Sequence, residues 1–155
     1  MAGIFKAYDI RGIYGKDLDE AMAYKIGRAF VTFTDARKVV VARDIRPHSE
    51  PLFTELARGI TEQGADVIDI GHGSTPMLYF ANGTLDADAG VMITASHNPA
   101  EWNGFKLCRA KAEPISGDTG IVDIEQIVHS GKFAPLPEKS GKVSTYDIVP
   151  EYAKH

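Results

Sequence analysis

Two hydrophobic patterns alternate along this chain, one typical of strands and the other of helices. Short runs rich in β-branched residues occur at residues 38–42, 67–70 and 90–94, and the first contains three valines in a row, as in a strand covered on both faces. Other apolar residues recur at intervals of three and four, which places them on helix faces: Leu18, Met22, Ile26, Ala29, Phe30 and Phe33, then Leu52, Phe53, Leu56, Ala57 and Ile60. The alternation predicts an α/β fold, a three-layer α/β/α domain with a mixed sheet of about four to five strands.

Turn and cap residues set the predicted boundaries of these elements. A short strand at residues 4–8 is expected to lead into a loop at residues 9–15. Ser49 and Thr75 are predicted N-caps, each followed by a proline in the first helical turn. Asn103-Gly104 is a predicted turn, after which residues 105–108 form a strand. A last helix over residues 121–128 is expected to end near Gly131.

The chain is expected to divide into two parts. Residues 132–142 contain Pro135, Pro137 and Gly141 and are predicted to form a linker. We therefore expect one domain at residues 1–134 and a C-terminal arm at residues 135–155 that leads toward a second domain.

Composition excludes several classes of function. The formal net charge is −4 and lysines and arginines are scattered, whereas a nucleic-acid-binding protein normally carries a basic stripe, so no nucleic-acid partner is expected. Cys108 is the single cysteine, which rules out an internal disulfide and suits a reducing compartment. Residues 1–10 do not resemble a signal peptide, and no stretch approaches the roughly 20 apolar residues that span a bilayer. A cytoplasmic location without membrane contact is predicted.

The segment Thr94-Ala95-Ser96-His97-Asn98-Pro99 follows a predicted buried strand. Ligands of α/β sheets tend to meet the loops beyond the carboxyl ends of strands, so a serine here can be firmly held and still exposed. The residue before a proline avoids helical geometry, so the loop should not continue as a helix. A Ser-His hydrolase is disfavoured, because the nucleophile elbow requires glycine where this chain has Thr94 and Asn98.

Four segments in order resemble a known family. They are Phe5-Lys6-Ala7-Tyr8-Asp9-Ile10-Arg11-Gly12, the Thr94–Pro99 segment, Asn103-Gly104-Phe105-Lys106, and Pro114-Ile115-Ser116-Gly117-Asp118-Thr119-Gly120. Together they resemble the N-terminal domain I of the phosphomannomutase/phosphoglucomutase (alpha-D-phosphohexomutase) family, which carries the catalytic phosphoserine. The resemblance covers nearly the whole chain.

The resemblance implies an activity and assigns residues to it. Enzymes of this family interconvert hexose 6-phosphate and hexose 1-phosphate of mannose or glucose through a 1,6-bisphosphate intermediate, and glucose 1,6-bisphosphate serves as activator. Ser96 would carry the phosphate, and Arg11 and Lys106 would act on the phosphate being transferred. A phosphoserine adds roughly −1.5 to −2 of charge, which makes nearby cations necessary. Tyr8, His97 and Asn98 are the expected residues of the phosphate and substrate loop.

The resemblance also implies Mg²⁺, held by an oxygen of the Ser96 phosphate and by three aspartates of an Asp-Gly-Asp-Gly-Asp-Arg loop. This sequence contains no such loop. The segment with Asp86 and Asp88 has only two of the three aspartates of that loop and no arginine, so we interpret it as a solvated turn. The chain is therefore expected to be an isolated N-terminal domain, inactive alone, whose partners are hexose phosphates and the remaining domains of the same polypeptide.

Two alternatives remain open at this stage. One is a relative of the phosphoglucosamine mutase type, although Lys6-Ala7-Tyr8-Asp9 favours the mannose/glucose branch. The other is a non-catalytic module that binds phosphosugars. Asp44 and Arg46 are interpreted as structural partners rather than catalysts, and His48, His72 and His129 are assigned no function.

Overall fold

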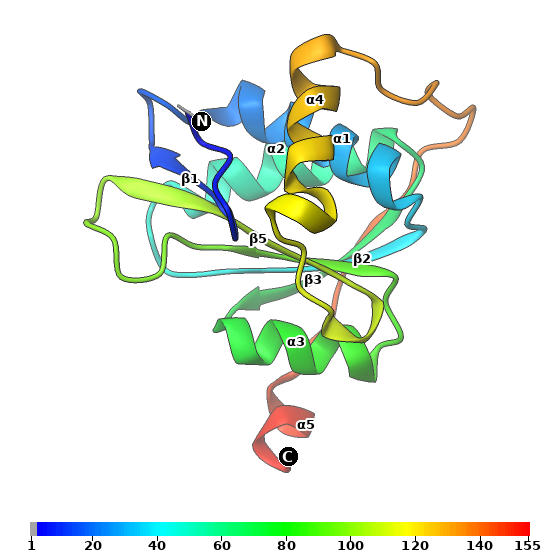
Figure 1. The fold of residues 1–155 in the computed structure, drawn as a ribbon. Helices are drawn as coiled ribbons and strands as arrows, with labels where there is room; N and C mark the ends of the chain where they lie inside the picture. Colours follow the sequence, from blue (N-terminus) through cyan, green and yellow to red (C-terminus); the bar gives the residue numbers. More distant parts are fainter. Residues whose placement is uncertain (1–2) are drawn as a thin grey trace.

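The computed structural model describes residues 3–155, and over these residues six strands form one mixed sheet (Figure 1). Their order across the sheet is β1-β5-β4-β2-β3-β6. The strands are β1 (Ile10–Ile13), β2 (Lys38–Arg43), β3 (Asp66–His72), β4 (Ala89–Ile93), β5 (Trp102–Arg109) and β6 (Val143–Thr145). The four strands β4, β2, β3 and β6 are parallel, whereas β5 runs antiparallel to β4 and β1 antiparallel to β5. The mixed sheet is confirmed, with more strands than the four to five predicted.

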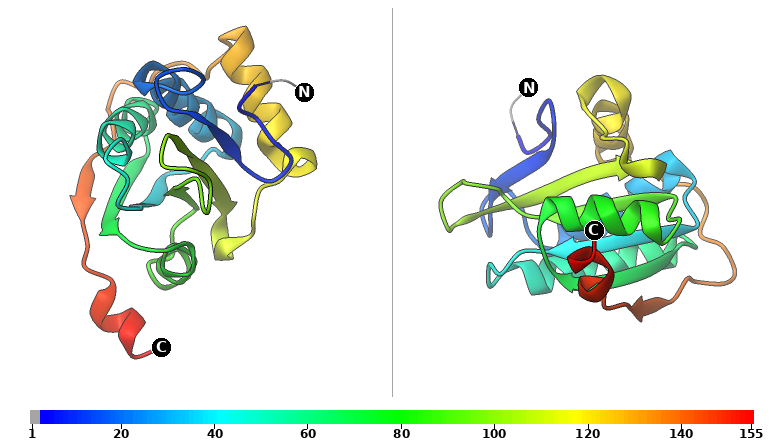
Figure 2. Two further views of the ribbon diagram at one scale, coloured as in Figure 1. Left: turned by 90° about the vertical axis from the view of Figure 1, so that its left-hand side faces the viewer. Right: turned by 90° about the horizontal axis from the view of Figure 1, so that it is seen from below.

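Helices cover both faces of the sheet, which confirms the three-layer α/β/α arrangement (Figures 1 and 2). The helices α1 (Glu20–Thr34), α2 (Ser49–Glu62) and α4 (Val122–Ser130) pack on one face. On the other face lies α3 (Thr75–Thr84), which α5 (Val149–Ala153) contacts. Two short helical turns, η1 (Ala110–Ala112) and η2 (Gly117–Ile121), connect β5 to α4. Along the described chain, residues 3–155, no helix has both the length and the apolar character that crossing a bilayer requires.

Two predicted N-caps differ from the structure. Ser74 caps α3, since its extended backbone lets its Oγ accept a hydrogen bond from the Met77 amide at 3.3 Å, and Thr75 is already the first helical residue. Ser49 is likewise the first residue of α2 rather than its cap. Its side chain is fully buried and its hydroxyl donates a hydrogen bond to Asp44, so this serine makes a tertiary contact rather than capping the helix.

The N-terminal strand and the Asn103-Gly104 turn were predicted wrongly. Phe5 makes a single bridge to Ile10, and the regular strand is β1, inside the expected loop. Asn103 and Gly104 lie within β5 and pair with β1. A β carbon at Gly104 would overlap the Ile10 carbonyl oxygen and lie 2.9 Å from Arg11 Cγ. Glycine is needed here because β1 approaches closely, not because the chain turns.

The segment that follows α4 lies against the domain. Gly131 ends α4 in a left-handed conformation, as predicted. Farther on, the Gly141 amide donates to the Thr61 carbonyl, and β6 pairs with β3. Ile148, just before α5, is fully buried in the core beneath α3. The division into a domain at residues 1–134 and an arm at residues 135–155 stays a prediction.

Candidate active site

Ser96 lies in the loop that joins β4 to β5, at the left of Figure 1. It is exposed, directly beyond the carboxyl end of a fully buried strand. Its φ is +56°, in the left-handed region that serine rarely adopts. The Ser96 amide donates to Thr94 Oγ1 at 3.0 Å, and the Asn98 amide donates to the Ala95 carbonyl at 3.0 Å. The loop is therefore a compact turn that presents the serine hydroxyl to solvent.

Arg11 reaches this loop from β1. Its Nη1 donates to Asn98 Oδ1 at 2.8 Å, and its Nε donates to Asp9 Oδ1 at 3.0 Å. Its side chain remains 36% exposed. Arginine carries five N–H groups, and the other three make no hydrogen bond with any residue between 3 and 155. The expected proximity of Arg11 to the Ser96 loop is observed, with Arg11 on a strand rather than in a loop.

Lys106 lies on β5, where it is half-buried and opposite Met92 of β4. Directly opposed residues point to the same face of a sheet, so Lys106 is on the face that α3 covers. Arg11 pairs with Gly104, two residues before Lys106, and therefore shares this face. The ammonium makes no hydrogen bond or ion pair with the described residues 3–155. The structure thus brings Arg11 and Lys106 to one face without joining them through a contact.

The other three predicted residues have different positions. Asn98 is half-buried and accepts from Arg11, which agrees with a loop-shaping residue. His97 is exposed beside Ser96. Tyr8 is 82% exposed and lines a separate hollow of about 120 Å³ with Ala7 and residues 116–118, so it does not pack in the core. Nothing in the geometry ties Tyr8 to Ser96.

The loop from β2 to α2 supplies contacts to the Ser96 loop that the sequence did not assign. Arg46 donates hydrogen bonds to main-chain carbonyls of that loop, and His48 Nε2 lies 3.0 Å from the Ala100 carbonyl oxygen. His48 also stacks on Tyr14, with ring centroids 4.7 Å apart. One signal could have indicated this role. Residues 44–47 follow β2, the parallel neighbour of β4, and such strands end at the same edge of a sheet.

The described residues of this chain do not form a magnesium site by themselves. Within residues 3–155 no three His, Cys, Asp or Glu side chains gather closely enough to hold a metal ion. Near the Ser96 loop, Asp9 is paired with Arg11 and Asp44 with Arg46, so both carboxylates already have cationic partners. A phosphate on Ser96 could offer oxygen ligands, which Mg²⁺ prefers, but the remaining ligands would have to come from elsewhere. Asp88 is used structurally, accepting from the Arg37 and Lys38 amides.

Two perturbed groups near the sheet have structural explanations. Burial raises the pKa of Cys108 to about 12, so its thiol stays protonated and unreactive. Burial would lower the pKa of Arg43, but hydrogen bonds to Glu50 and Asp69 outweigh it and raise that pKa. Neither group touches Ser96, and neither adds chemistry to the site.

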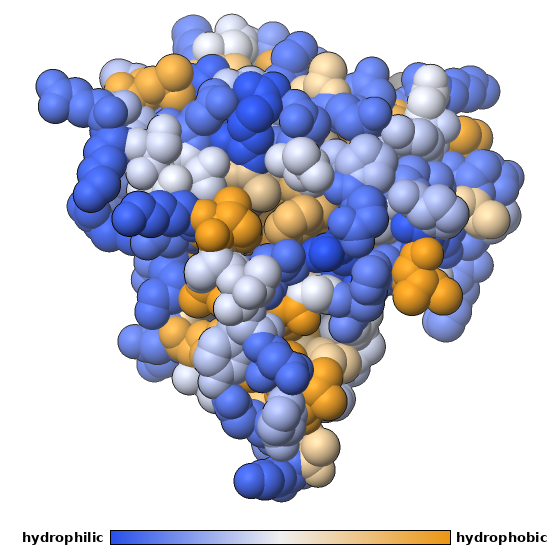
Figure 3. Space-filling view, turned by 180° about the vertical axis from the view of Figure 1, so that it is seen from behind, coloured by the Kyte–Doolittle hydropathy of each residue, from blue (hydrophilic) through white to orange (hydrophobic). Residues whose placement is uncertain are grey.

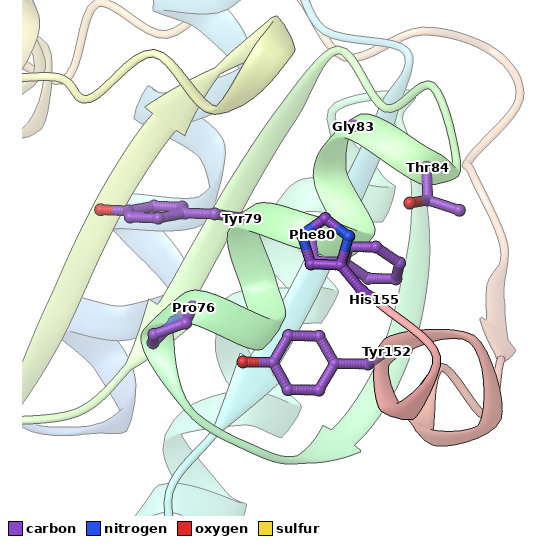
Figure 4. A pocket seen from close by; sticks show the side chains of 7 residues that line it. All are labelled: Pro76, Tyr79, Phe80, Gly83, Thr84, Tyr152 and His155. Carbon is purple, nitrogen blue, oxygen red and sulfur yellow. The ribbon is translucent and has the colours of Figure 1, made fainter.

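A second hollow, of about 760 Å³, lies between α3 and α5 (Figure 4). Aromatic rings dominate its lining, which consists of Pro76, Tyr79, Phe80, Gly83, Thr84, Tyr152 and His155. Seen from behind, hydrophobic atoms are more frequent toward the α5 end than over the upper, mainly hydrophilic part (Figure 3). The lining contains no aspartate, glutamate, lysine or arginine side chain, so it lacks the cationic side chains that phosphoryl transfer requires.

The three-layer α/β/α fold, with an exposed serine beyond the carboxyl end of β4, agrees with the resemblance noted in the sequence, and comparison with known proteins identifies the family. Residues 2–135 match the family model of phosphoglucomutase/phosphomannomutase, alpha/beta/alpha domain I, and the chain belongs to this family.

Three relatives illustrate the similarity. A phosphomannomutase of Klebsiella pneumoniae is 47% identical over 149 residues, which cover 96% of this chain and 95% of that protein. A phosphomannomutase of Escherichia coli is 47% identical over 152 residues, 97% of this chain, so the chain spans about a third (33%) of that relative's length. The crystal structure of a phosphoglucomutase/phosphomannomutase family protein from Burkholderia thailandensis superposes with a TM-score of 0.88 and 37% identity, covering 97% of this chain and 34% of that chain.

Proposed function

We propose that this chain is the phosphoserine domain of a phosphohexomutase that interconverts hexose 6-phosphate and hexose 1-phosphate of mannose or glucose. One observation carries the proposal. The exposed Ser96 hydroxyl lies at the carboxyl end of β4, in a loop that Arg11 binds while three of its N–H groups remain without a partner among residues 3–155. Membership of the family supports the assignment of the phosphate to this serine.

The proposed reaction transfers one phosphoryl group in each direction. The free hydroxyl of the hexose phosphate attacks the phosphorus on Ser96, the bond from phosphorus to Ser96 Oγ breaks, and a hexose 1,6-bisphosphate forms. The proton of the attacking hydroxyl is transferred to Ser96 Oγ, and Lys106 is our candidate for the general acid/base that carries it. Ser96 Oγ then attacks the phosphorus of the other phosphate, the bond from that phosphorus to the hexose oxygen breaks, and the serine proton passes to that oxygen. This step restores the phosphoserine and releases the isomeric monophosphate.

Arg11 has the geometry to stabilise the charge that moves in this reaction. Phosphoryl transfer depends on positioning and charge neutralisation, and a planar guanidinium can bind two phosphate oxygens at once. We propose that its unpaired N–H groups bind the phosphate on Ser96, and that His97 and Asn98 shape the loop around it. Mg²⁺ would neutralise further charge when bound. We propose that its ligands besides the Ser96 phosphate, and the residues that recognise the sugar, belong to further domains of the same polypeptide.

The test is phosphate transfer to Ser96. Full-length polypeptide that carries this domain is incubated with labelled glucose 1,6-bisphosphate, and the label is mapped by mass spectrometry. We expect label on Ser96 and none in a Ser96→Ala variant, whose mutase activity should fall by orders of magnitude while its thermal unfolding is unchanged, because an exposed hydroxyl contributes little to stability. Label on another residue, with Ser96 unmodified, refutes the assignment. A non-catalytic phosphosugar-binding module would acquire no label.

The isolated chain is expected to fold but not to catalyse the reaction. It has its own core on both faces of the sheet, but remote binding of the second phosphate and closure over the substrate would be lacking. A coupled assay with glucose 1-phosphate or mannose 1-phosphate, Mg²⁺ and the bisphosphate activator measures turnover, and calorimetry on the same sample measures unfolding. Turnover above about a thousandth of the full-length rate contradicts the proposal that catalysis requires the further domains.

A further inference from the structure

Arg46 uses all five N–H groups of its guanidinium within the protein. Its Nε donates to Asp44 Oδ2 at 3.2 Å. Its Nη1 donates to the carbonyls of Pro99 and Trp102, at 2.7 and 2.9 Å, and its Nη2 donates to those of Ser96 and Asn98, at 3.1 and 2.8 Å. The side chain is only 15% exposed. Because arginine has five such donors in a planar fork, Arg46 has none left for a ligand.

A second set of contacts holds Arg46 itself in place. The other carboxylate oxygen of Asp44 accepts from the Arg46 amide at 3.1 Å and from Ser49 Oγ at 2.7 Å. Ser49 Oγ in turn accepts from Asn103 Nδ2 at 2.9 Å, and both of these residues are fully buried. The guanidinium is therefore anchored to the start of α2 and to β5, two elements of the rigid core. A satisfied network of this kind fixes one geometry more strongly than separate pairs would.

The two arginines near Ser96 thus differ in what they can bind. Arg11 keeps three N–H groups without a partner among residues 3–155, whereas all donors of Arg46 are engaged by the loop and by Asp44. The carbonyls that Arg46 binds are that of Ser96 itself, which has a left-handed φ of +56°, and those of three residues that follow it, Asn98, Pro99 and Trp102. Such a conformation persists in serine only where the surroundings hold it.

We propose that Arg46 is a positioning residue for Ser96: it binds the carbonyls of the loop and so keeps the serine hydroxyl in the geometry required for phosphoryl transfer, without contacting the phosphate. The proposal rests on the proposed function of Ser96. It separates the tasks of the two arginines, since Arg11 binds the phosphate and Arg46 binds the loop. Lysine cannot replace Arg46, because one ammonium has three donors at a single point and cannot span four carbonyls and a carboxylate.

The structural arm of the test uses the 155-residue chain and NMR. In the wild type, the Arg46 guanidinium should show hindered rotation, with separate resonances for its Nη protons. In Arg46→Lys, the amides of Ser96, Asn98 and Trp102, which donate hydrogen bonds within the loop, should exchange with solvent at least about tenfold faster, after correction for any change in global stability measured at β2 amides. Arg43→Lys is the matched control, because Arg43 ends β2, three residues before Arg46, and pairs with Glu50 and Asp69 rather than with the Ser96 loop. It should leave the corrected exchange of the loop unchanged.

The functional arm uses the full-length polypeptide. Because a misplacement of about 1 Å at a reacting group can cost roughly a hundredfold in rate, Arg46→Lys should lower kcat and the rate of Ser96 labelling by about that factor, with KM within about threefold. If Arg46→Lys does not fold, Asp44→Asn, which preserves size and removes the anchoring charge, should give the same selective loosening of the loop to a smaller extent.

The outcomes separate this inference from the proposed function. Loop exchange in the Arg46→Lys or Asp44→Asn chain that rises no more than in Arg43→Lys overturns the positioning role, even if Ser96 is labelled. A single averaged NMR resonance for the Nη protons of wild-type Arg46, which would show free rotation of the guanidinium, overturns the positioning role as well. Selective loosening of the loop without any label on wild-type Ser96 would support the structural role of Arg46 and refute the proposed function instead.

Discussion

Replacing Gly104 with alanine should push β1 away from β5. The new β carbon would overlap the Ile10 carbonyl oxygen and lie 2.9 Å from Arg11 Cγ and 3.0 Å from Arg11 Cα. Two of these three atoms belong to the main chain of β1, so no side-chain rotation can relieve the contact. The strand must therefore move away from β5.

The expected cost follows from what that movement disturbs. Overpacking in a well-packed site typically costs about 1–3 kcal/mol. The β1–β5 ladder joins four residue pairs, and weakening one or two of its hydrogen bonds adds about 1 kcal/mol each. We expect Gly104→Ala to lower the free energy of unfolding by about 2–5 kcal/mol.

Urea denaturation followed by circular dichroism measures this change in the 155-residue chain. Gly83→Ala is the matched control, because Gly83 lies in α3 and a β carbon added there would have no heavy atom within 4 Å. Alanine there should stabilise the chain by about 0.5–1 kcal/mol. NMR shifts of the Arg11 and Asn98 side chains should change in Gly104→Ala alone. A Gly104→Ala chain within about 0.5 kcal/mol of the wild type would refute the requirement for glycine.

Three further expectations concern single residues. In the full-length polypeptide, Arg11→Lys should lower kcat far more than it raises KM, since lysine cannot bind phosphate bidentately. An unchanged kcat with a higher KM would show instead that Arg11 contributes to binding of the substrate in its ground state. Burial raises the pKa of the Cys108 thiol from 9.0 to about 12, so this thiol should resist iodoacetamide at pH 8 until urea is added. The free energy of unfolding should fall as pH rises above 9, because only the thiol of the unfolded chain ionises there. The hydrogen bond from Tyr24 lowers the pKa of Glu62, so Glu62 stabilises the chain above pH 4.5 and this contribution is lost as pH falls through the lowered pKa. Glu62→Gln should accordingly lower the urea midpoint at pH 7, and the difference in midpoint between this variant and the wild type should shrink at pH 3. A difference that does not change with pH would contradict a stabilising role of the ionised Glu62 carboxylate.

The elements predicted well are those with a strong local pattern. Valine-rich runs and apolar periodicity indicate the buried strands β2, β3 and β4 and the amphipathic helices α1 and α2. The three residues of β6 are all exposed and show no alternation, and they become a strand only because the edge of β3 offers hydrogen bonds. Gly104 was misinterpreted for a related reason, since a dipeptide that favours turns was overridden by a neighbouring strand.

The candidate site was predictable only where residue type and motif carry the information. Ser96 and Arg11 belong to recognisable segments, and the structure brings those segments together through Asn98. The role of Arg46 has no local signature, because its partners are main-chain carbonyls 50 to 56 residues away. Carbonyls are present at every residue, so only the fold determines which of them an arginine meets.

The pairing of β1 with β5 also has a consequence for the order in which the chain folds. β1 comes first among the described strands, whereas its partner β5 is the fifth, and Arg11 and Asn98 are 87 residues apart in sequence. Closing so long a loop is entropically unfavourable until the intervening sheet has formed. We therefore expect β1 to stay unpaired during synthesis while β2, β3 and β4 assemble, and Arg11 to reach the Ser96 loop only after β5 has emerged. Amides of β1 should accordingly gain protection last in pulse-labelled refolding, so that the serine receives its cationic neighbour as one of the final steps of folding.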